Sequence, residues 1–134
     1  MEILFVDDEK RWITSYIDEL KASGFKVHYE ATIDSAIKFF DAHHERISLL
    51  ILDIMMPPGE AFTLEETENG LRSGVLFYDV IRKKKPALPV ILLTNISDDE
   101  VKKRFDQEEN CLFLRKPECF PYELVEKVKN ILER

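Results

Sequence analysis

The chain has 134 residues, of which 45% are hydrophobic and 34% charged, and this fits one globular domain, residues 1–134, with a core of its own. The formal net charge of −7 argues against direct binding of nucleic acid, because that binding depends on neutralising phosphates. No apolar run is long enough to cross a membrane, and acids rather than a basic segment follow Met1, so we expect a cytoplasmic protein without membrane insertion.

Short apolar runs alternate with amphipathic segments along the chain. Runs of this length, without a helical period, are typical of strands buried on both faces of a parallel sheet. We expect strands at residues 3–6, 25–29, 48–52, 89–93 and 111–114. The second of them alternates between polar and apolar residues, which indicates a strand nearer an edge of the sheet.

Apolar residues at helical spacing predict a helix after each strand. The first helix should end near Gly24, a residue type that is common just beyond a helix, and Thr32 can cap the second. A third helix is expected over about 71–84, and residues 97–100 form a capping box that opens a fourth. The apolar face of the last helix consists of Leu124, Val125, Val128, Ile131 and Leu132. Repeated strand–helix units predict a doubly wound α/β sandwich with a parallel sheet.

One connection, residues 54–70, is unusually long. It contains Pro57, Pro58 and Gly59 followed by several glutamates. Connections of this length are often functional or mobile, although most surface loops vary without consequence. The sequence leaves three interpretations open: a lid, a surface for docking a partner, or a neutral elaboration.

Polar residues stand at the ends of four expected strands, namely Asp7 with Asp8, then Asp53, Thr94 and Lys116. The carboxyl ends of parallel strands lie along one edge of the sheet, so these side chains should gather there. Three carboxylates at close range repel one another and need a cation. Oxygen ligands without histidine or cysteine favour a hard ion such as Mg²⁺.

A carboxylate held beside Mg²⁺ and a lysine can attack phosphorus and form an aspartyl phosphate. Lys116 supplies a point charge for a phosphoryl oxygen, and Thr94 supplies a hydroxyl. A P-loop and a glycine-rich dinucleotide turn are both absent from the sequence, so the site is not built for a nucleotide. Taken singly, Asp7 or Asp8 would be a helix cap and the other residues ordinary turns, and only their joint placement favours this chemistry.

These residues resemble the receiver domain of two-component response regulators over essentially the whole chain. The resemblance is carried by Asp7, Asp8, Asp53 with Met56 and Pro57 beyond it, Thr94, and Lys116 with Pro117. It implies one receiver domain with a flavodoxin-like (βα)5 three-layer sandwich and the strand order 2-1-3-4-5. It also implies a phosphoacceptor of a phosphorelay that changes its partner binding and is not an enzyme, because it turns over no separate substrate.

The resemblance assigns a role to each site residue. Asp53 would be the phosphoacceptor. Asp8 and Asp53 would bind Mg²⁺ directly, together with the backbone carbonyl of Met55, and Asp7 would help through a water molecule. Lys116 would pair with the phosphoryl group.

Further roles concern the response to phosphorylation. Thr94 would move to hydrogen-bond the phosphoryl group, and Phe113 would be the switch residue in the fifth strand. The position after Thr94 is usually small in the family, and here it is Asn95, so we expect Asn95 to modulate the lifetime of the phosphorylated state. The implied partners are a histidine kinase or phosphotransfer protein and an unidentified downstream protein.

Two other classes of protein deserve comparison. A receiver-like interaction module could keep the fold without being phosphorylated, although the complete residue set argues against it. A phosphohydrolase similar to the haloacid dehalogenases would also use an aspartate nucleophile. That family places two acids at alternate positions after its first strand, whereas Asp7 and Asp8 are adjacent here, and no segment is large enough for a substrate cap.

Overall fold

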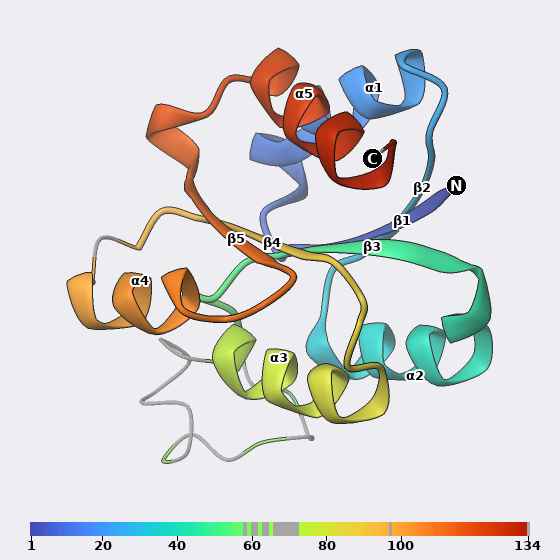
Figure 1. Ribbon diagram of the computed structural model, residues 1–134. Coiled ribbons are helices and arrows are strands. Elements are labelled where there is room, and N and C mark those ends of the chain that lie inside the picture. The colour runs from blue at the N-terminus through green and yellow to red at the C-terminus, as the bar shows by residue number, and fades with distance from the viewer. Residues whose placement is uncertain (58, 60–61, 63–64, 66–72, 97, 134) are drawn as a thin grey trace.

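Five parallel strands form the central layer of the computed structural model, between two layers of helices (Figure 1). The structure describes every residue except 58, 60–61, 63–64, 66–72, 97 and 134. The strands are β1 (Glu2–Val6), β2 (Lys26–Glu30), β3 (Ile47–Leu52), β4 (Val90–Thr94) and β5 (Cys111–Arg115). The helices are α1 (Lys10–Ala22), α2 (Ile33–His43), α3 (Ser73–Lys84), α4 (Asp99–Asp106) and α5 (Pro121–Leu132), with 3-10 turns η1 (His44–Arg46) and η2 (Lys116–Glu118).

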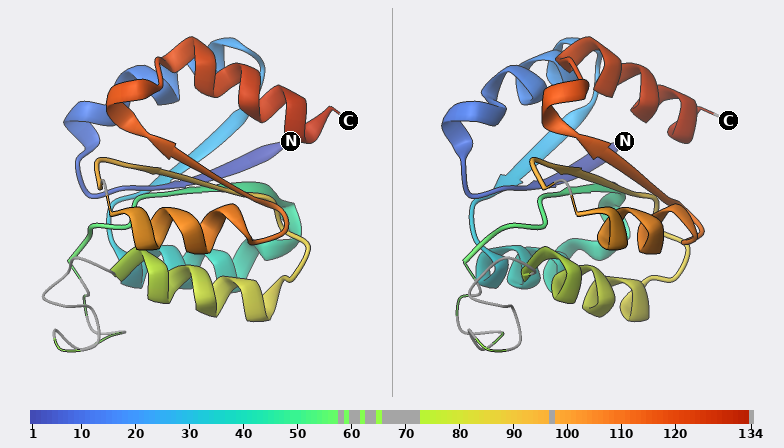
Figure 2. Two further views of the ribbon diagram at one scale, coloured as in Figure 1. Left: turned by 60° about the vertical axis from the view of Figure 1, so that its left-hand side comes forward. Right: turned by 90° about the vertical axis from the view of Figure 1, so that its left-hand side faces the viewer.

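The strand order is β2-β1-β3-β4-β5, and every pairing is parallel, which confirms the predicted fold. Helices α1 and α5 cover one face of the sheet, and α2, α3 and α4 cover the other (Figures 1 and 2). The helix after β1 and the helix after β3 therefore lie on opposite faces. The carboxyl ends of β1 and β3 form the switch point where ligands bind in folds of this kind.

Alternate residues of each buried strand serve two separate cores, because successive side chains of a strand point to opposite faces. In β3, Leu50 and Leu52 pack with α2, α3 and α4, while Leu49 and Ile51 pack with α1 and α5. All four are fully buried, which explains the unbroken apolar run. The strand is therefore held on both faces, and the residue that follows it, Asp53, has a fixed position.

Local signals set most helix ends as predicted. The hydroxyl of Thr32 caps α2 by accepting from the amide of Ser35 at 3.1 Å. Gly24 follows α1 with a φ of +95°, in the left-handed region that glycine tolerates. Asp98 caps α4 and accepts from two backbone amides of the first turn. The predicted capping box began at residue 97, which lies outside the described residues.

The interpretations of residues 54–70 also fall mainly outside the described residues, as does the predicted start of the third helix at 71. Helix α3 is described from Ser73 onward. Over the described parts of the chain, no helix combines the length and the apolar character needed to cross a membrane.

Candidate functional site

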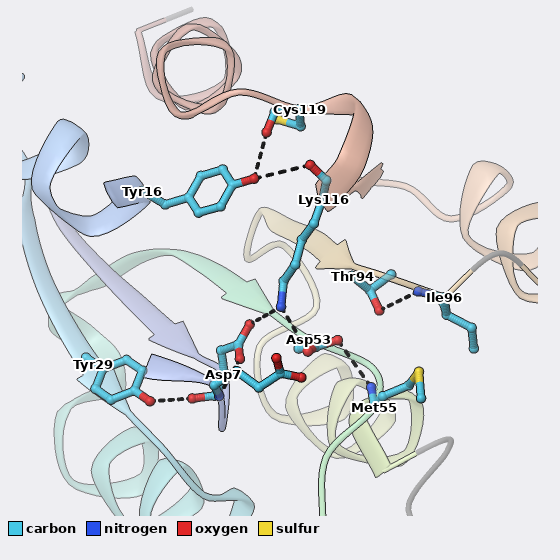
Figure 3. Close-up of polar contacts among 10 residues, drawn as sticks. Asp7, Tyr16, Tyr29, Asp53, Met55, Thr94, Ile96, Lys116 and Cys119 are labelled. Atoms are coloured by element: carbon cyan, nitrogen blue, oxygen red, sulfur yellow. Dashed lines mark hydrogen bonds and ion pairs between the residues drawn. The ribbon is translucent and has the colours of Figure 1, made fainter. Parts of the chain in front are cut away.

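The predicted site residues meet at the carboxyl edge of the sheet (Figure 3). Asp7 and Asp8 follow β1, Asp53 follows β3, Thr94 is the last residue of β4, and Lys116 follows β5. Asp7, Asp53 and Thr94 are buried, whereas Asp8 is exposed. The site therefore has three buried polar side chains and one exposed acid.

Lys116 reaches two of the buried carboxylates. Its Nζ lies 2.7 Å from Oδ2 of Asp7 and 3.2 Å from Oδ2 of Asp53 (Figure 3). Only 8% of the lysine side chain is exposed, so these ion pairs are poorly screened by solvent. The sequence predicted the proximity of Lys116 to Asp53, but not that Lys116 would bridge Asp53 and Asp7.

Backbone amides orient the two carboxylates further. The amide of Met55 donates to Oδ1 of Asp53 at 3.2 Å, and the amide of Glu9 donates to Oδ1 of Asp7 at 2.8 Å. Each acid thus accepts from Lys116 on one oxygen and from a nearby amide on the other. This arrangement fixes the rotation of both carboxylates before any ligand binds.

Burial dominates the electrostatics of the site. Burial, with repulsion from Asp7, raises the pKa of Asp53 above its ordinary value, although Lys116 and the Thr94 hydroxyl oppose this. Burial by itself lowers the pKa of Lys116, but attraction to Asp53 and the hydrogen bond to Asp7 outweigh it, and the net shift is upward. Lys116 therefore stays protonated at neutral pH.

The acids at this edge can hold a metal ion. One carboxylate oxygen from each of Asp7, Asp8 and Asp53 lies within 4.8 Å of the others. These are hard oxygen donors, with no histidine or cysteine among them, and such donors suit Mg²⁺ better than a softer ion. The donor set therefore fits the magnesium site that the sequence predicted.

The environment of Asp8 disfavours the ionised form of its carboxylate when no cation is bound. Burial and the neighbouring Asp7 raise its pKa, so ionised Asp8 destabilises the fold once the pH rises above the ordinary carboxylate range. We expect Asp8→Asn to have a higher melting temperature than wild type in EDTA at neutral pH. The variant should lose the stabilisation by Mg²⁺, which for wild type is about 1.4 kcal/mol when Mg²⁺ is about ten times its dissociation constant.

Thermal unfolding with EDTA and with Mg²⁺ measures both effects. Glu9→Gln is the matched control, because it removes the next exposed acid along the chain without touching the three clustered carboxylates. A wild-type response to Mg²⁺ in Asp8→Asn would mean that Asp8 is not a ligand.

The remaining predicted residues surround the site. Oγ1 of Thr94 accepts from the amide of Ile96 at 3.2 Å (Figure 3). Phe113 is half-buried and packs against the core beneath α4, beside a small hollow that Ile96 also lines. Asn95 is exposed and lines a second hollow of about 310 Å³, together with Lys116. Met55 is partly exposed, and the metal-binding role of its carbonyl stays a prediction.

The sequence did not predict that three further residues would lie near the site. The hydroxyls of Tyr16 and Tyr29 contact backbone carbonyls on either side of it (Figure 3). Gly74, in the first turn of α3, lies directly against the backbone of Asp53 and Ile54. Its position beside Ser73, at the start of an amphipathic helix, was the available signal for this contact.

An acid–lysine pair at the switch point of a flavodoxin-like sheet, with two further acids beside it, defines a receiver-like α/β domain. The chain belongs to the response regulator receiver domain family, because the model of that family matches residues 3–129. This membership confirms the resemblance that the sequence suggested. A comparison with curated protein sequences found no match.

Solved structures agree with this assignment. The receiver domain of the Francisella response regulator 1452 has a TM-score of 0.78 and 20% identity, over 99% of this chain and 97% of that one. A receiver domain protein from Clostridium thermocellum has a TM-score of 0.78 and 24% identity, over 99% and 94%. Both support the fold. The BeF3-activated receiver domain of DrrB, a Thermotoga maritima protein, is 30% identical, with a TM-score of 0.72 over 99% and 97%.

Proposed function

We propose that this receiver domain stores a signal as a phosphoryl group on Asp53, accepted from a phosphohistidine of a kinase or phosphotransfer protein. The observation that carries the proposal is the buried Asp53 carboxylate, with the Nζ of Lys116 3.2 Å away and two further acids beside it. A fixed, buried carboxylate next to a fixed cation suits phosphoryl transfer, in which catalysis is mostly positioning and charge neutralisation.

In the proposed transfer an oxygen of Asp53 attacks the phosphorus atom. An O–P bond forms, the P–N bond of phosphohistidine breaks, and the electron pair of that bond goes to the imidazole nitrogen. Lys116 stays protonated and turns its charge from the carboxylates toward the phosphoryl oxygens. Bound Mg²⁺, held by Asp8 and Asp53 with help from Asp7, would supply further neutralisation of the phosphoryl charge.

The new group would change the surroundings of Asp53 and so alter partner binding. Thr94 is buried beside Asp53, and its hydroxyl, which accepts from the Ile96 amide, would turn to donate to a phosphoryl oxygen. Phe113 of β5 pairs with Leu92 of β4. A shift of β4 and α4 would therefore change the packing around Phe113. The proposal is a two-state switch, whose balance phosphorylation biases.

Receiver domains interact with histidine kinases and downstream effectors, and this is the partner class of the family. A similar structure, 26% identical, is the receiver domain of the hybrid histidine kinase CckA. We propose the same partner class here, a cytoplasmic location, and no catalytic turnover of a separate substrate. Activation of the DrrB receiver domain by BeF3 supports a site of this kind in a relative.

The deciding experiment is intact mass spectrometry after incubation with acetyl phosphate. We expect a single phosphoryl adduct in wild type with Mg²⁺, and none in EDTA or in Asp53→Asn. Asp79→Asn is a suitable control, because it removes a partly exposed acid on α3 that pairs with Arg104, away from the site. An adduct that persists in Asp53→Asn would disprove Asp53 as the acceptor. No adduct in wild type would favour the interaction module.

Asn95 offers a test of the lifetime of the adduct. It lines the hollow that reaches Lys116, so its side chain stands where water would approach the phosphoryl group. We expect Asn95→Ala to change the first-order rate of adduct loss by about three- to tenfold, the effect of one hydrogen-bonding group. The measurement is the decay of the adduct mass after acetyl phosphate is removed, and an unchanged rate would exclude this role.

A further inference from the structure

Tyr29, near the end of the edge strand β2, contacts the turn that carries the two acids. Its hydroxyl donates to the backbone carbonyl of Asp7 at 2.6 Å (Figure 3). The amide of Asp7 donates in turn to the carbonyl of Glu30 at 3.2 Å. Both backbone polar groups of Asp7 are therefore tied to β2, one of them by ordinary sheet pairing and the other by a side chain.

The hydrogen bond from Tyr29 bears on Asp8 as well. The carbonyl of Asp7 and the amide of Asp8 belong to one planar peptide unit, so fixing the carbonyl oxygen fixes the plane from which Asp8 departs. Asp8 is the exposed acid of the cluster. The direction of its side chain depends on the backbone that Tyr29 holds, because the side chain departs from that peptide unit.

Tyr16 makes a corresponding contact on the other side of the site. It lies on α1 with only 7% of its surface exposed. Its hydroxyl donates to the carbonyl of Cys119 at 2.7 Å and lies 3.3 Å from the carbonyl of Lys116 (Figure 3). These two carbonyls bracket the turn η2, so one side chain fixes both ends of the turn that presents Lys116.

We propose that Tyr29 and Tyr16 are positioning residues with separate tasks. Tyr29 orients the Asp7–Asp8 peptide for binding of the divalent cation, and Tyr16 orients Lys116 for phosphoryl transfer. The second task rests on the proposed function, whereas the first needs only the cation site. Neither hydroxyl touches the reacting atoms, and each acts through the backbone of a neighbouring turn.

The test uses Tyr29→Phe and Tyr16→Phe, which keep the aromatic rings and remove only the hydroxyls. Mg²⁺ affinity is measured from the rise in melting temperature with Mg²⁺ concentration, and the rate of phosphorylation from adduct formation with acetyl phosphate at saturating Mg²⁺. Loss of one hydrogen bond corresponds to a change of about three- to tenfold in a binding or rate constant. We expect Tyr29→Phe to weaken Mg²⁺ binding by that factor without changing the saturated rate. Tyr16→Phe should slow the saturated rate by that factor and leave Mg²⁺ affinity unchanged.

Tyr78→Phe is the matched control. The hydroxyl of Tyr78 accepts from Nε of Arg82 at 3.0 Å, and Arg82 binds carbonyls near the amino ends of β4 and β5, at the opposite edge of the sheet. This variant should be less stable than wild type, but its Mg²⁺ affinity and its saturated rate of phosphorylation should be unchanged. If all three variants behave alike, or if both constants move together in Tyr29→Phe and Tyr16→Phe, the tyrosines are only structural and the proposal fails. If wild type forms no adduct but Tyr29→Phe still weakens Mg²⁺ binding, the proposed function fails and the role of Tyr29 stands.

Discussion

Lys116→Met is expected to abolish phosphorylation by acetyl phosphate and to destabilise the fold at neutral pH. Methionine fills most of the lysine volume but leaves the carboxylates of Asp7 and Asp53 buried without the cation that pairs with both. Removing one partner of a buried ion pair typically costs about 3 to 5 kcal/mol. The rate of phosphorylation should fall roughly a hundredfold or more, since Lys116 is a fixed charge beside Asp53, the proposed acceptor.

The pH dependence identifies the cause of this loss. The pKa of Lys116 is raised in the folded state, so its stabilising contribution is complete below the ordinary lysine value and disappears only as the pH rises through the folded value. Burial already raises the pKa of Asp53, and loss of Lys116 should raise it further. The folded variant then binds more protons than the unfolded chain, and its stability rises as the pH falls from neutral toward the ordinary carboxylate range.

Urea unfolding of wild type and Lys116→Met between about pH 4.5 and 8 measures this difference. The gap in the free energy of unfolding should be widest at neutral pH and should narrow in acid. Lys84→Met is the control, because the Lys84–Asp41 pair is exposed and contributes at most about 1 kcal/mol. A gap that is the same at every pH would mean that packing, rather than uncompensated charge, explains the loss.

The sequence was sufficient to predict the fold and the proximity of Asp53 and Lys116 at one edge of the sheet. A short continuous run such as residues 49–52 favours a strand with both faces covered, and strands of that kind indicate a parallel sheet with helices on both sides. Once the strands are parallel, Asp53 and Lys116 must lie at one edge of the sheet. The prediction needed no side-chain geometry, because topology alone brings these residues together.

Side-chain contacts between distant segments leave no recognisable pattern in the sequence, so they could not be predicted. Tyr16 and Lys116 are 100 positions apart, and Tyr29 and Asp7 are 22 apart. Tyr16 has the spacing of an ordinary core residue of α1, and it is indeed buried there. The helical spacing therefore gives no indication that its hydroxyl contacts a distant carbonyl. The bridge from Lys116 to Asp7 was missed for the same reason.

Gly74 was missed for a different reason. The sequence offers two glycines near the start of the third helix, and Asn69–Gly70, a common turn pair, gave the stronger local signal. The contact that matters is a close approach between backbones, which depends on where α3 sits against the end of β3. Gly74 donates from its amide to the carbonyl of Ile54 at 2.8 Å, and this bond fixes that position.

Gly74→Ala is therefore expected to be more damaging than a glycine-to-alanine change in a helix normally is. A β-carbon at residue 74 would overlap the carbonyl oxygen of Asp53 and lie 2.5 Å from Cα of Ile54. Both obstacles are backbone atoms, so no side-chain rotation relieves the overlap, and α3 must move away from β3. We expect a loss of about 3 kcal/mol in the free energy of unfolding, the upper part of the range for an overpacked site.

The overlap should also affect phosphorylation, because two of the three backbone atoms that the new β-carbon would meet belong to Asp53. We expect Gly74→Ala to slow adduct formation with acetyl phosphate by roughly a hundredfold, since a shift of about 1 Å at a reacting group has this effect. Gly24→Ala serves as the control. It places a β-carbon at a positive φ, which costs about 1 to 2 kcal/mol, but no atom lies within 4 Å and the site is at the other end of the strands.

Comparison of these two variants separates stability from positioning. If Gly24→Ala is less stable than wild type yet forms the adduct at the wild-type rate, while Gly74→Ala forms it slowly even at a temperature where it is fully folded, the rate depends on the position of Asp53. Equal rates in all three proteins would show that the end of β3 tolerates a displaced α3. Helix α3 would then support β3 without controlling the position of Asp53.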